Sequence, residues 1–325
     1  MIGVLRAVLG ALAMLALTPA FAAAQPERAV AVTIDDLPFA HGGQGCTEDG
    51  ARTFTAEFLA MLSREGVPAV GFANPGRGCG EGPADPRLLE AWLDAGFELG
   101  SHSNTHPDIN DIGLVAYEAD VVAAESVLRP MLERRGGRLV WYRHPYLRTG
   151  ATEQIRGGMA RFLAGRGYRV APVTFDNSEW IYAAVYARAL ARGDAAEARR
   201  IGEAYVEHMR EITAFFEARS NAILGREPPQ VLLIHANLLN RDWFPKVKAM
   251  LASRGYRFVS LEEATRDPAY AKPDILVGRY GMSWILRWGL LDGAPVVREP
   301  DPPAWVDALY RAGGAPRPTV APAAK

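Results

Sequence analysis

Residues 30–36 read VAVTIDD, a short apolar run that leads directly into two carboxylates. An apolar run of this length, rich in β-branched residues, is typical of a buried strand. Asp35 and Asp36 stand where that strand ends. In sheets of parallel strands, enzymes place their sites at the carboxyl ends of the strands. An isolated Asp-Asp pair is more often a turn or a helix cap, so its meaning depends on the rest of the chain.

Strand-like runs alternate with helical patterns along most of the sequence, which favours βα units around a parallel sheet. Expected strands are 30–34, 69–73, 97–100, 139–143, 168–174, 231–235 and 257–260. Expected helices are 53–65, 86–95, 116–135, 151–165 and 243–254. No repeat of fixed period is present, which argues against a solenoid or a propeller. The predicted fold class is α/β.

Composition sets further bounds. The 325 residues suit one large domain with decorations or two small ones, and 49% hydrophobic residues are ample for a sizeable core. A formal net charge of −1 argues against a nucleic-acid partner, and no long basic run would seek an anionic membrane.

The first 24 residues have the pattern of a secretory signal peptide. Arg6 precedes an apolar stretch at 7–17, and Ala22-Ala23-Ala24 fits a cleavage site. We therefore expect an exported domain at 25–312, periplasmic or secreted, with no membrane contact after cleavage. An uncleaved membrane anchor is the alternative. The Ala- and Pro-rich tail at 313–325 is expected to be disordered.

Cys46 and Cys79 are the chain's two cysteines, each in a Gly-rich loop after an expected strand. An oxidising compartment would let them form a disulfide. A role as metal ligands is the alternative, which the lack of a Cys-x-x-Cys motif disfavours.

Between about 181 and 228 the alternation gives way to a helical insertion. Gly193 is expected to end one helix, and Asp194 with Glu197 forms a capping box that starts the next. One face of that second helix is apolar at Ile201, Tyr205, Met209, Ile212 and Phe216. We expect a helical hairpin packed on the main fold rather than a cofactor site, with His208 as a packing or surface residue.

Histidines stand at two further places where chemistry would need them. His102 and His106 are four residues apart and can converge on one ion if the segment turns helically, with a carboxylate as third ligand. Such a set suits Zn²⁺, and also Co²⁺ or Ni²⁺. His235 ends an expected strand, where a proton-donor role competes with that of a buried structural histidine. Arg143 also ends a strand and could hold a carboxylate ionised, or form a plain surface salt bridge.

Taken in order, these segments resemble the polysaccharide deacetylase (NodB-homology) family, carbohydrate esterase family four. The resemblance runs from about 30 to 263. It rests on TIDD at 33–36, HSNTH at 102–106, RHPY at 143–146, Asp176 with Trp180, and LLIH at 232–235. The family implies a distorted (β/α) barrel, often of about seven strands.

The resemblance also implies roles for the residues at one side of the site. Asp35 would be the catalytic base, and Arg143 would orient it. Asp36, His102 and His106 would bind a divalent metal, with zinc as the first choice.

At the other side, the Tyr146 backbone N–H would help to hold an oxyanion. Asp176 and Trp180 would line the groove and support the acid, His235. The implied reaction is metal-dependent removal of N-acetyl groups from an amino-sugar glycan or oligosaccharide, with release of acetate. An O-acetyl esterase or a small-amide amidase could use the same site, and a catalytically inactive glycan-binding module is the alternative of another class.

Three departures from the family pattern are expected to change the substrate groove rather than the chemistry. Leu37-Pro38 replaces the usual Gly after the first motif and would make a bulkier turn at the mouth. Glu179 stands where Asp is common. The helical insertion is longer than a minimal member needs. The acetylated substrate, the metal and the oligomeric state stay open.

Overall fold

The computed structural model describes residues 28–40, 46–80 and 82–314. The expected signal peptide at 1–24 and nearly all of the expected disordered tail lie outside the described residues. Within them, no helix is long and apolar enough to cross a membrane.

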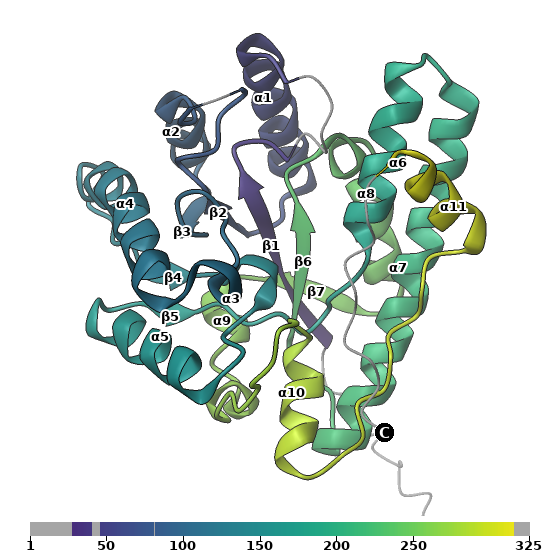
Figure 1. The fold of residues 1–325 in the computed structure, drawn as a ribbon. Helices are drawn as coiled ribbons and strands as arrows, with labels where there is room; N and C mark the ends of the chain where they lie inside the picture. Colours follow the sequence, from purple (N-terminus) through teal and green to yellow (C-terminus); the bar gives the residue numbers. More distant parts are fainter. Residues whose placement is uncertain (1–27, 41–45, 81, 315–325) are drawn as a thin grey trace, which may run out of the picture.

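Seven parallel strands form one sheet that curls into a half-barrel (Figure 1). The strands are β1 (Arg28–Leu37), β2 (Ala69–Ala73), β3 (Glu98–Ser101), β4 (Trp141–Tyr142), β5 (Arg169–Val170), β6 (Gln230–His235) and β7 (Tyr256–Val259). Their order is β5-β4-β3-β2-β1-β6, and β7 pairs with the first residues of β1. The predicted α/β class and the distorted barrel of about seven strands are confirmed.

Helices surround the sheet (Figure 1). They are α1 (Glu48–Glu65), α2 (Pro86–Asp94), α3 (Ile109–Ile112), α4 (Leu114–Glu133), α5 (Glu153–Gly165), α6 (Glu179–Ala191), α7 (Ala195–Leu224), α8 (Leu238–Ser253), α9 (Leu261–Ala264), α10 (Trp284–Leu291) and α11 (Ala304–Ala312). Two short 3₁₀ turns lie at Pro145–Leu147 and Pro268–Ala271. The segment after α9, including α10 and α11, was not anticipated from the sequence.

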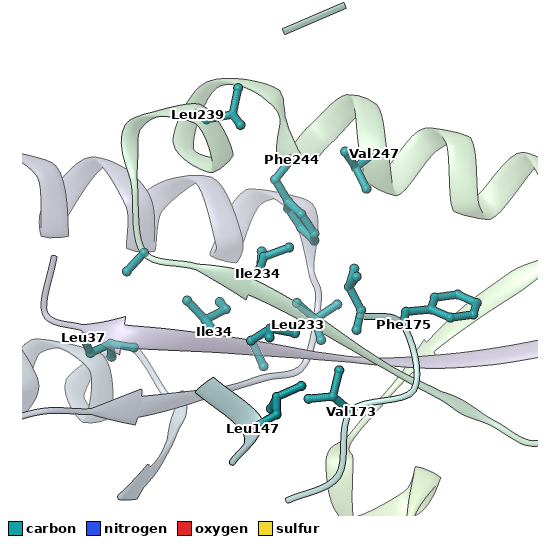
Figure 2. Packing of buried hydrophobic residues seen from close by; sticks show 14 of the residues in the cluster. Ile34, Leu37, Leu147, Val173, Phe175, Leu233, Ile234, Leu239, Phe244 and Val247 are labelled. Carbon is teal, nitrogen blue, oxygen red and sulfur yellow. The ribbon is translucent and has the colours of Figure 1, made fainter. Parts of the chain in front are cut away.

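The central strand β1 is buried on both faces, as parallel strands covered by helices are. Its alternate residues enter two different clusters. Ala29 and Ala31 join a small cluster with Phe72 and Trp141, whereas Val32 and Ile34 join the main core. Figure 2 shows the main core, in which Phe244 points from α8 toward Ile234 on β6. This two-sided burial fixes the register of β1 and therefore the positions of the carboxylates at its end.

The residue after those carboxylates belongs to the core. Leu37 is only 1% exposed, and its side chain lies so close to Gly71 on β2 that a Cβ there would meet it at 2.6 Å. Pro38 is also buried. The expectation that Leu37-Pro38 crowds the mouth of the site is therefore wrong, because the strand continues through Leu37 and turns this side chain into the core.

The insertion forms the helices α6 and α7. The Asp194 side chain accepts the Glu197 backbone N–H at 2.9 Å, as the capping pattern predicts. His208 lies buried on α7 with its ring 5.2 Å from that of Tyr182 on α6. The helical contacts of α7 include α6, α8 and α10, so the insertion is packed into the body of the fold.

Candidate active site

Asp35 and Asp36 leave the end of β1 in different directions. Asp35 continues the extended strand and pairs in register with His235 on β6. Asp36 has a positive φ of 62°, in the left-handed region that a non-glycine residue rarely occupies. The backbone therefore turns between the two residues, so that only Asp35 reaches Arg143 and only Asp36 reaches His106, while both lie near His102.

The Asp36 carboxylate faces two histidines. Its Oδ1 lies 3.7 Å from His102 Nε2 and 3.5 Å from His106 Nε2. One donor atom from each of the three side chains fits within 4.8 Å of the others. Two imidazoles and one carboxylate are a donor set that suits Zn²⁺ and related divalent ions. The structure thus brings the three predicted ligands together.

The path between the two histidines is not the helical turn expected from their spacing. Ser103 and His106 both have positive φ, of 65° and 60°, so the chain makes a compact loop. The Ser103 hydroxyl accepts the His106 backbone N–H at 3.1 Å, and the Asp120 carboxylate accepts the Asn104 N–H at 2.7 Å. These local bonds satisfy the loop backbone and let the second ring fold back toward the first.

His102 is held in the orientation of a metal ligand. Its Nδ1 lies 2.8 Å from the carbonyl oxygen of Arg143, to which an Nδ1–H would donate, leaving the Nε2 lone pair facing Asp36. Burial lowers the pKa of both His102 and His106, which favours neutral imidazoles. Burial raises the pKa of Asp36, but the nearby histidines and Arg77 outweigh it and hold that pKa well below its usual value. An ionised carboxylate and two neutral imidazoles are the forms that bind a cation.

Asp35 is a buried carboxylate with a buried cation beside it. Arg143 Nη1 lies 3.2 Å from both Asp35 carboxylate oxygens, and Arg143 is itself fixed by bonds to the Thr33 hydroxyl and the Ala171 carbonyl. Burial raises the pKa of Asp35, the charges of Arg143 and His235 lower it, and the balance is about 6. A carboxylate that titrates near neutral pH is suited to general-base work.

His235 is partnered by Glu179. The Glu179 Oε2 lies 2.7 Å from His235 Nδ1, while Oε1 accepts from Asn240 Nδ2 at 2.8 Å and from Asn237. Burial lowers the pKa of His235, but Glu179 and then the two aspartates outweigh it and raise the pKa to about 9. The interpretation of Glu179 as a change in the groove is therefore wrong. Its side chain is fully buried beneath β6, where its two oxygens meet the histidine ring and the asparagine amides.

Asp176 and Trp180 occupy other positions. Asp176 is half-buried, and its Oδ1 accepts the Asn177 N–H at 2.9 Å. Burial raises the pKa of Asp176 to about 6, against the Asn177 N–H and the charges of Arg287, His235 and Arg143, which lower it. The Trp180 ring packs edge-on against Tyr310 of α11 at 5.3 Å. Asp176 and Trp180 were expected to support the His235 ring. The hydrogen bond to that ring is instead made by Glu179.

Comparison with known proteins agrees with this geometry. Residues 22–157 match the family described as polysaccharide deacetylase. This part of the chain is similar to the polysaccharide deacetylase family. The matched segment contains Asp35, Asp36, both ligand-like histidines and Arg143, whereas His235 and Glu179 lie beyond it.

Two relatives of this chain are named chitin deacetylase. The one from Colletotrichum lindemuthianum is 28% identical over 165 residues, covering 50% of this chain and 57% of the relative. The one from Pestalotiopsis sp is 29% identical over 152 residues, covering 46% of this chain and 43% of the relative. The chain thus spans about half the length of the curated relatives it matches.

Solved structures of similar proteins include the Colletotrichum lindemuthianum chitin deacetylase, 22% identical, with 74% of this chain and 88% of that chain covered at a TM-score of 0.46. A peptidoglycan deacetylase from Bacillus subtilis is 18% identical, with 75% and 95% covered at a TM-score of 0.45.

The family motif around Tyr146 forms an exposed lip. Tyr146 has a positive φ of 56°, its side chain is 52% exposed, and its ring lies 4.4 Å from that of His106. The Arg148 guanidinium lies 4.9 Å from the centre of the Tyr146 ring. The Tyr146 ring therefore packs edge-on against one of the three ligand-like residues.

The expected disulfide is confirmed. Cys46 and Cys79 are bonded, with 5.0 Å between their Cα atoms. Two residues before Cys79, Arg77 reaches back toward the site, and its Nη1 lies 3.5 Å from Asp36 Oδ1. The disulfide tethers the loop that carries this arginine.

Sequence reasoning missed the role of Glu179, although a signal was present. Glu179 was noted only as a departure from the family pattern, yet it is the first residue of α6 and its carboxylate reaches His235 at the end of β6.

Proposed function

We propose that this protein is a metal-dependent hydrolase that removes N-acetyl groups from an amino-sugar glycan or oligosaccharide and releases acetate. One observation carries the proposal. The donor atoms of Asp36, His102 and His106 converge beside a second carboxylate, Asp35, which is held by its own buried arginine and lies 3.6 Å from His102 Nε2. A structural ion site would need no such second carboxylate.

The donor set fits a divalent cation, with Zn²⁺ as the first choice and Co²⁺ or Ni²⁺ as alternatives. When bound there, such an ion supplies Lewis-acid polarisation of an acetyl carbonyl and a water of lowered pKa. Asp36, His102 and His106 would hold it. The His102 ring is already oriented by the Arg143 carbonyl, so little rearrangement is needed.

The remaining residues divide the proton transfers between them. Asp35, with a pKa of about 6, takes the proton of the attacking water at its carboxylate, and Arg143 holds that carboxylate in place. The Tyr146 backbone N–H helps to stabilise the oxyanion that develops on the acetyl oxygen. His235, protonated at neutral pH through its pairing with Glu179, gives its proton to the leaving amine.

Substrate class is proposed from the family and its relatives. The relatives are named for deacetylation of chitin, a polymer of N-acetylated amino sugar. Hydrolysis of an O-acetyl ester or of a small amide would use the same groups. The inactive glycan-binding alternative is disfavoured because Asp35 and all three ligand-like residues are retained at close range.

The proposed compartment is outside the cytoplasm. The Cys46–Cys79 disulfide supports an oxidising environment. The signal-like pattern at 1–24 agrees with export.

The deciding experiment incubates metal-loaded protein with N-acetylglucosamine oligomers, peptidoglycan and acetylated xylan, and measures acetate together with free amine. We expect acetate and amine in equal amounts from at least one amino-sugar substrate, and at least about 10²-fold slower release of both from the Asp35→Asn variant. Acetate without amine would indicate the esterase. Binding of glycan with no acetate from any substrate would indicate the inactive module.

A further inference from the structure

A segment near the end of the chain runs along the loop that carries Tyr146. This segment, here called the brace, comprises residues 274–287 and lies outside the matched family region at 22–157. Its Gly278 N–H donates to the Gly150 carbonyl at 3.0 Å, and the two glycines form an antiparallel bridge. The Thr149 hydroxyl donates to the Leu276 carbonyl at 3.3 Å. The brace therefore adds a short strand-like edge to the loop that follows β4.

Two brace residues reach the peptide units on either side of Leu147. Gly281 packs so closely that a Cβ at this position would lie 2.1 Å from the Tyr146 carbonyl oxygen and 2.7 Å from the Leu147 Cβ. Arg287 Nη2 donates to the Leu147 carbonyl at 2.6 Å. Only a residue without a side chain fits at the first contact, and the second is a charge-assisted hydrogen bond.

The loop needs such support because its backbone is strained. Tyr146 and Leu147 have φ values of 56° and 54°, and two successive residues with Cβ atoms are rarely left-handed. Residues held in such regions persist only where surrounding structure fixes them. Within the loop, the Leu147 N–H bonds to the His144 carbonyl and the Arg148 N–H to the Pro145 carbonyl, each at 3.0 Å.

The brace is itself firmly anchored. Arg287 is fully buried, forms an ion pair with Asp274, and stacks on Trp284 with its guanidinium carbon 3.7 Å from the ring centre. The Trp284 backbone N–H donates to the Val173 carbonyl at 2.7 Å, and the Ser283 hydroxyl donates to the Thr174 carbonyl at 2.7 Å. The brace thus connects the Tyr146 loop to the chain that leads into Asp176.

We infer that Gly281 and Arg287 are positioning residues, which hold the Tyr146–Leu147 backbone so that the Tyr146 N–H points to the developing oxyanion. The inference rests on the proposed function, in which that N–H stabilises the reaction. It assigns a catalytic support to a part of the chain that the family match does not reach. Neither residue is expected to touch substrate.

The test compares Gly281→Ala with Gly278→Ala in the full-length, metal-loaded protein. Both glycines lie in the brace, and neither has a positive φ. No heavy atom lies within 4 Å of a Cβ built at Gly278, which makes it the matched control. We expect kcat of Gly281→Ala to fall roughly 10- to 100-fold below that of the control, because an ångström-scale misplacement can cost about 10²-fold. KM and metal stoichiometry should stay within about two-fold, since a transition-state contact is lost rather than a binding contact. Equal kcat values in the two variants would overturn the inference.

A second readout does not depend on activity. Hydrogen exchange of peptides covering 143–150 should be faster in Gly281→Ala than in Gly278→Ala, since the Leu147 and Arg148 amides report on the loop. If the wild-type protein releases no acetate, the proposed function fails while this comparison still decides the inference, and equal protection would overturn it. If Gly281→Ala does not fold, Arg287→Lys takes its place. Lysine keeps the positive charge but lacks the planar guanidinium group, so kcat should fall with KM unchanged. An unchanged kcat would count against the inference.

Discussion

The two sides of the candidate site are built in different ways. On the ligand side, Asp36 and His106 take their positions from left-handed backbone, and His102 is oriented by a backbone carbonyl. On the acid side, His235 is oriented by the Glu179 carboxylate, which in turn is held by Asn240. The first arrangement depends mainly on backbone conformation and a backbone carbonyl, and the second on side chains far apart in the sequence.

This contrast predicts different responses to mutation. A ligand-side residue supplies an atom that either binds the ion or does not, so its substitution should abolish nearly all metal binding and activity. An acid-side residue acts through a chain of hydrogen bonds, so the loss of activity on substitution should decrease with its distance from His235.

The largest effect is expected from His102→Ala. Removing one of three donors should abolish stoichiometric metal binding, and activity should fall at least about 10⁴-fold, because Lewis-acid and water activation are lost together. Metal analysis after dialysis, with Zn²⁺ or Co²⁺ added back, measures this. His208→Leu is the control, since the ring nitrogens of this buried histidine have no hydrogen-bond partner among the described residues. Full activity of the wild-type protein without metal would contradict the prediction.

Substitution of the two adjacent aspartates should affect the metal content of the protein differently. Asp35→Asn should keep its metal and lose about 10²–10⁴-fold in kcat, the usual contribution of a general base. Asp36→Asn should lose both metal and activity, because its oxygen lies among the histidine nitrogens. Metal stoichiometry and kcat measured on both variants decide the matter. Equal metal content in the two would mean that base and ligand are assigned the wrong way round.

Much of the ligand side was predictable because short patterns in the sequence indicate its strands and its pair of histidines. The strand at Ala69–Ala73 was predicted with its observed bounds, and the spacing of His102 and His106 indicated a shared ion. The sequence did not indicate how the chain turns between them. A helical turn was expected, whereas left-handed residues make a loop, since hydroxyl and carboxylate side chains satisfy the backbone there.

The acid side and the brace were less predictable because their partners are distant. Glu179 and His235 are separated by 56 positions, so no local pattern connects them. Arg287 lies 140 positions from the carbonyl it binds on Leu147. The fifth strand was expected at 168–174 but ends at Val170, close to Pro172, which lacks the N–H that a strand ladder needs.

An intermediate effect is expected from Glu179→Gln. The carboxylate raises the pKa of His235, so its removal should bring that pKa down from about 9 toward the ordinary value near 6.5. A general acid works only while protonated, and activity falls as pH rises through its pKa. The alkaline limb of the kcat profile should therefore move to lower pH, with a loss of about 10-fold or more at pH 8 and a smaller loss at pH 6. An equal loss at every pH would indicate a structural role for Glu179 instead.

The smallest effect is expected at Tyr205, the outermost member of the acid-side network. Its hydroxyl donates to Asn240 Oδ1 at 2.8 Å, and Asn240 then donates to Glu179. In Tyr205→Phe the buried Asn240 Oδ1 loses its hydrogen-bond donor, which should lower the free energy of unfolding by about 1–3 kcal/mol. The fall in kcat should be only a few-fold, because Asn240 keeps a second bond to the His235 carbonyl at 2.9 Å. Tyr182→Phe is the matched control, since its ring centre lies 5.9 Å from that of Tyr205 and its buried hydroxyl has no partner among the described residues. Denaturant unfolding and kcat should distinguish the two tyrosines, and identical behaviour would show that the hairpin does not reach His235 through Asn240.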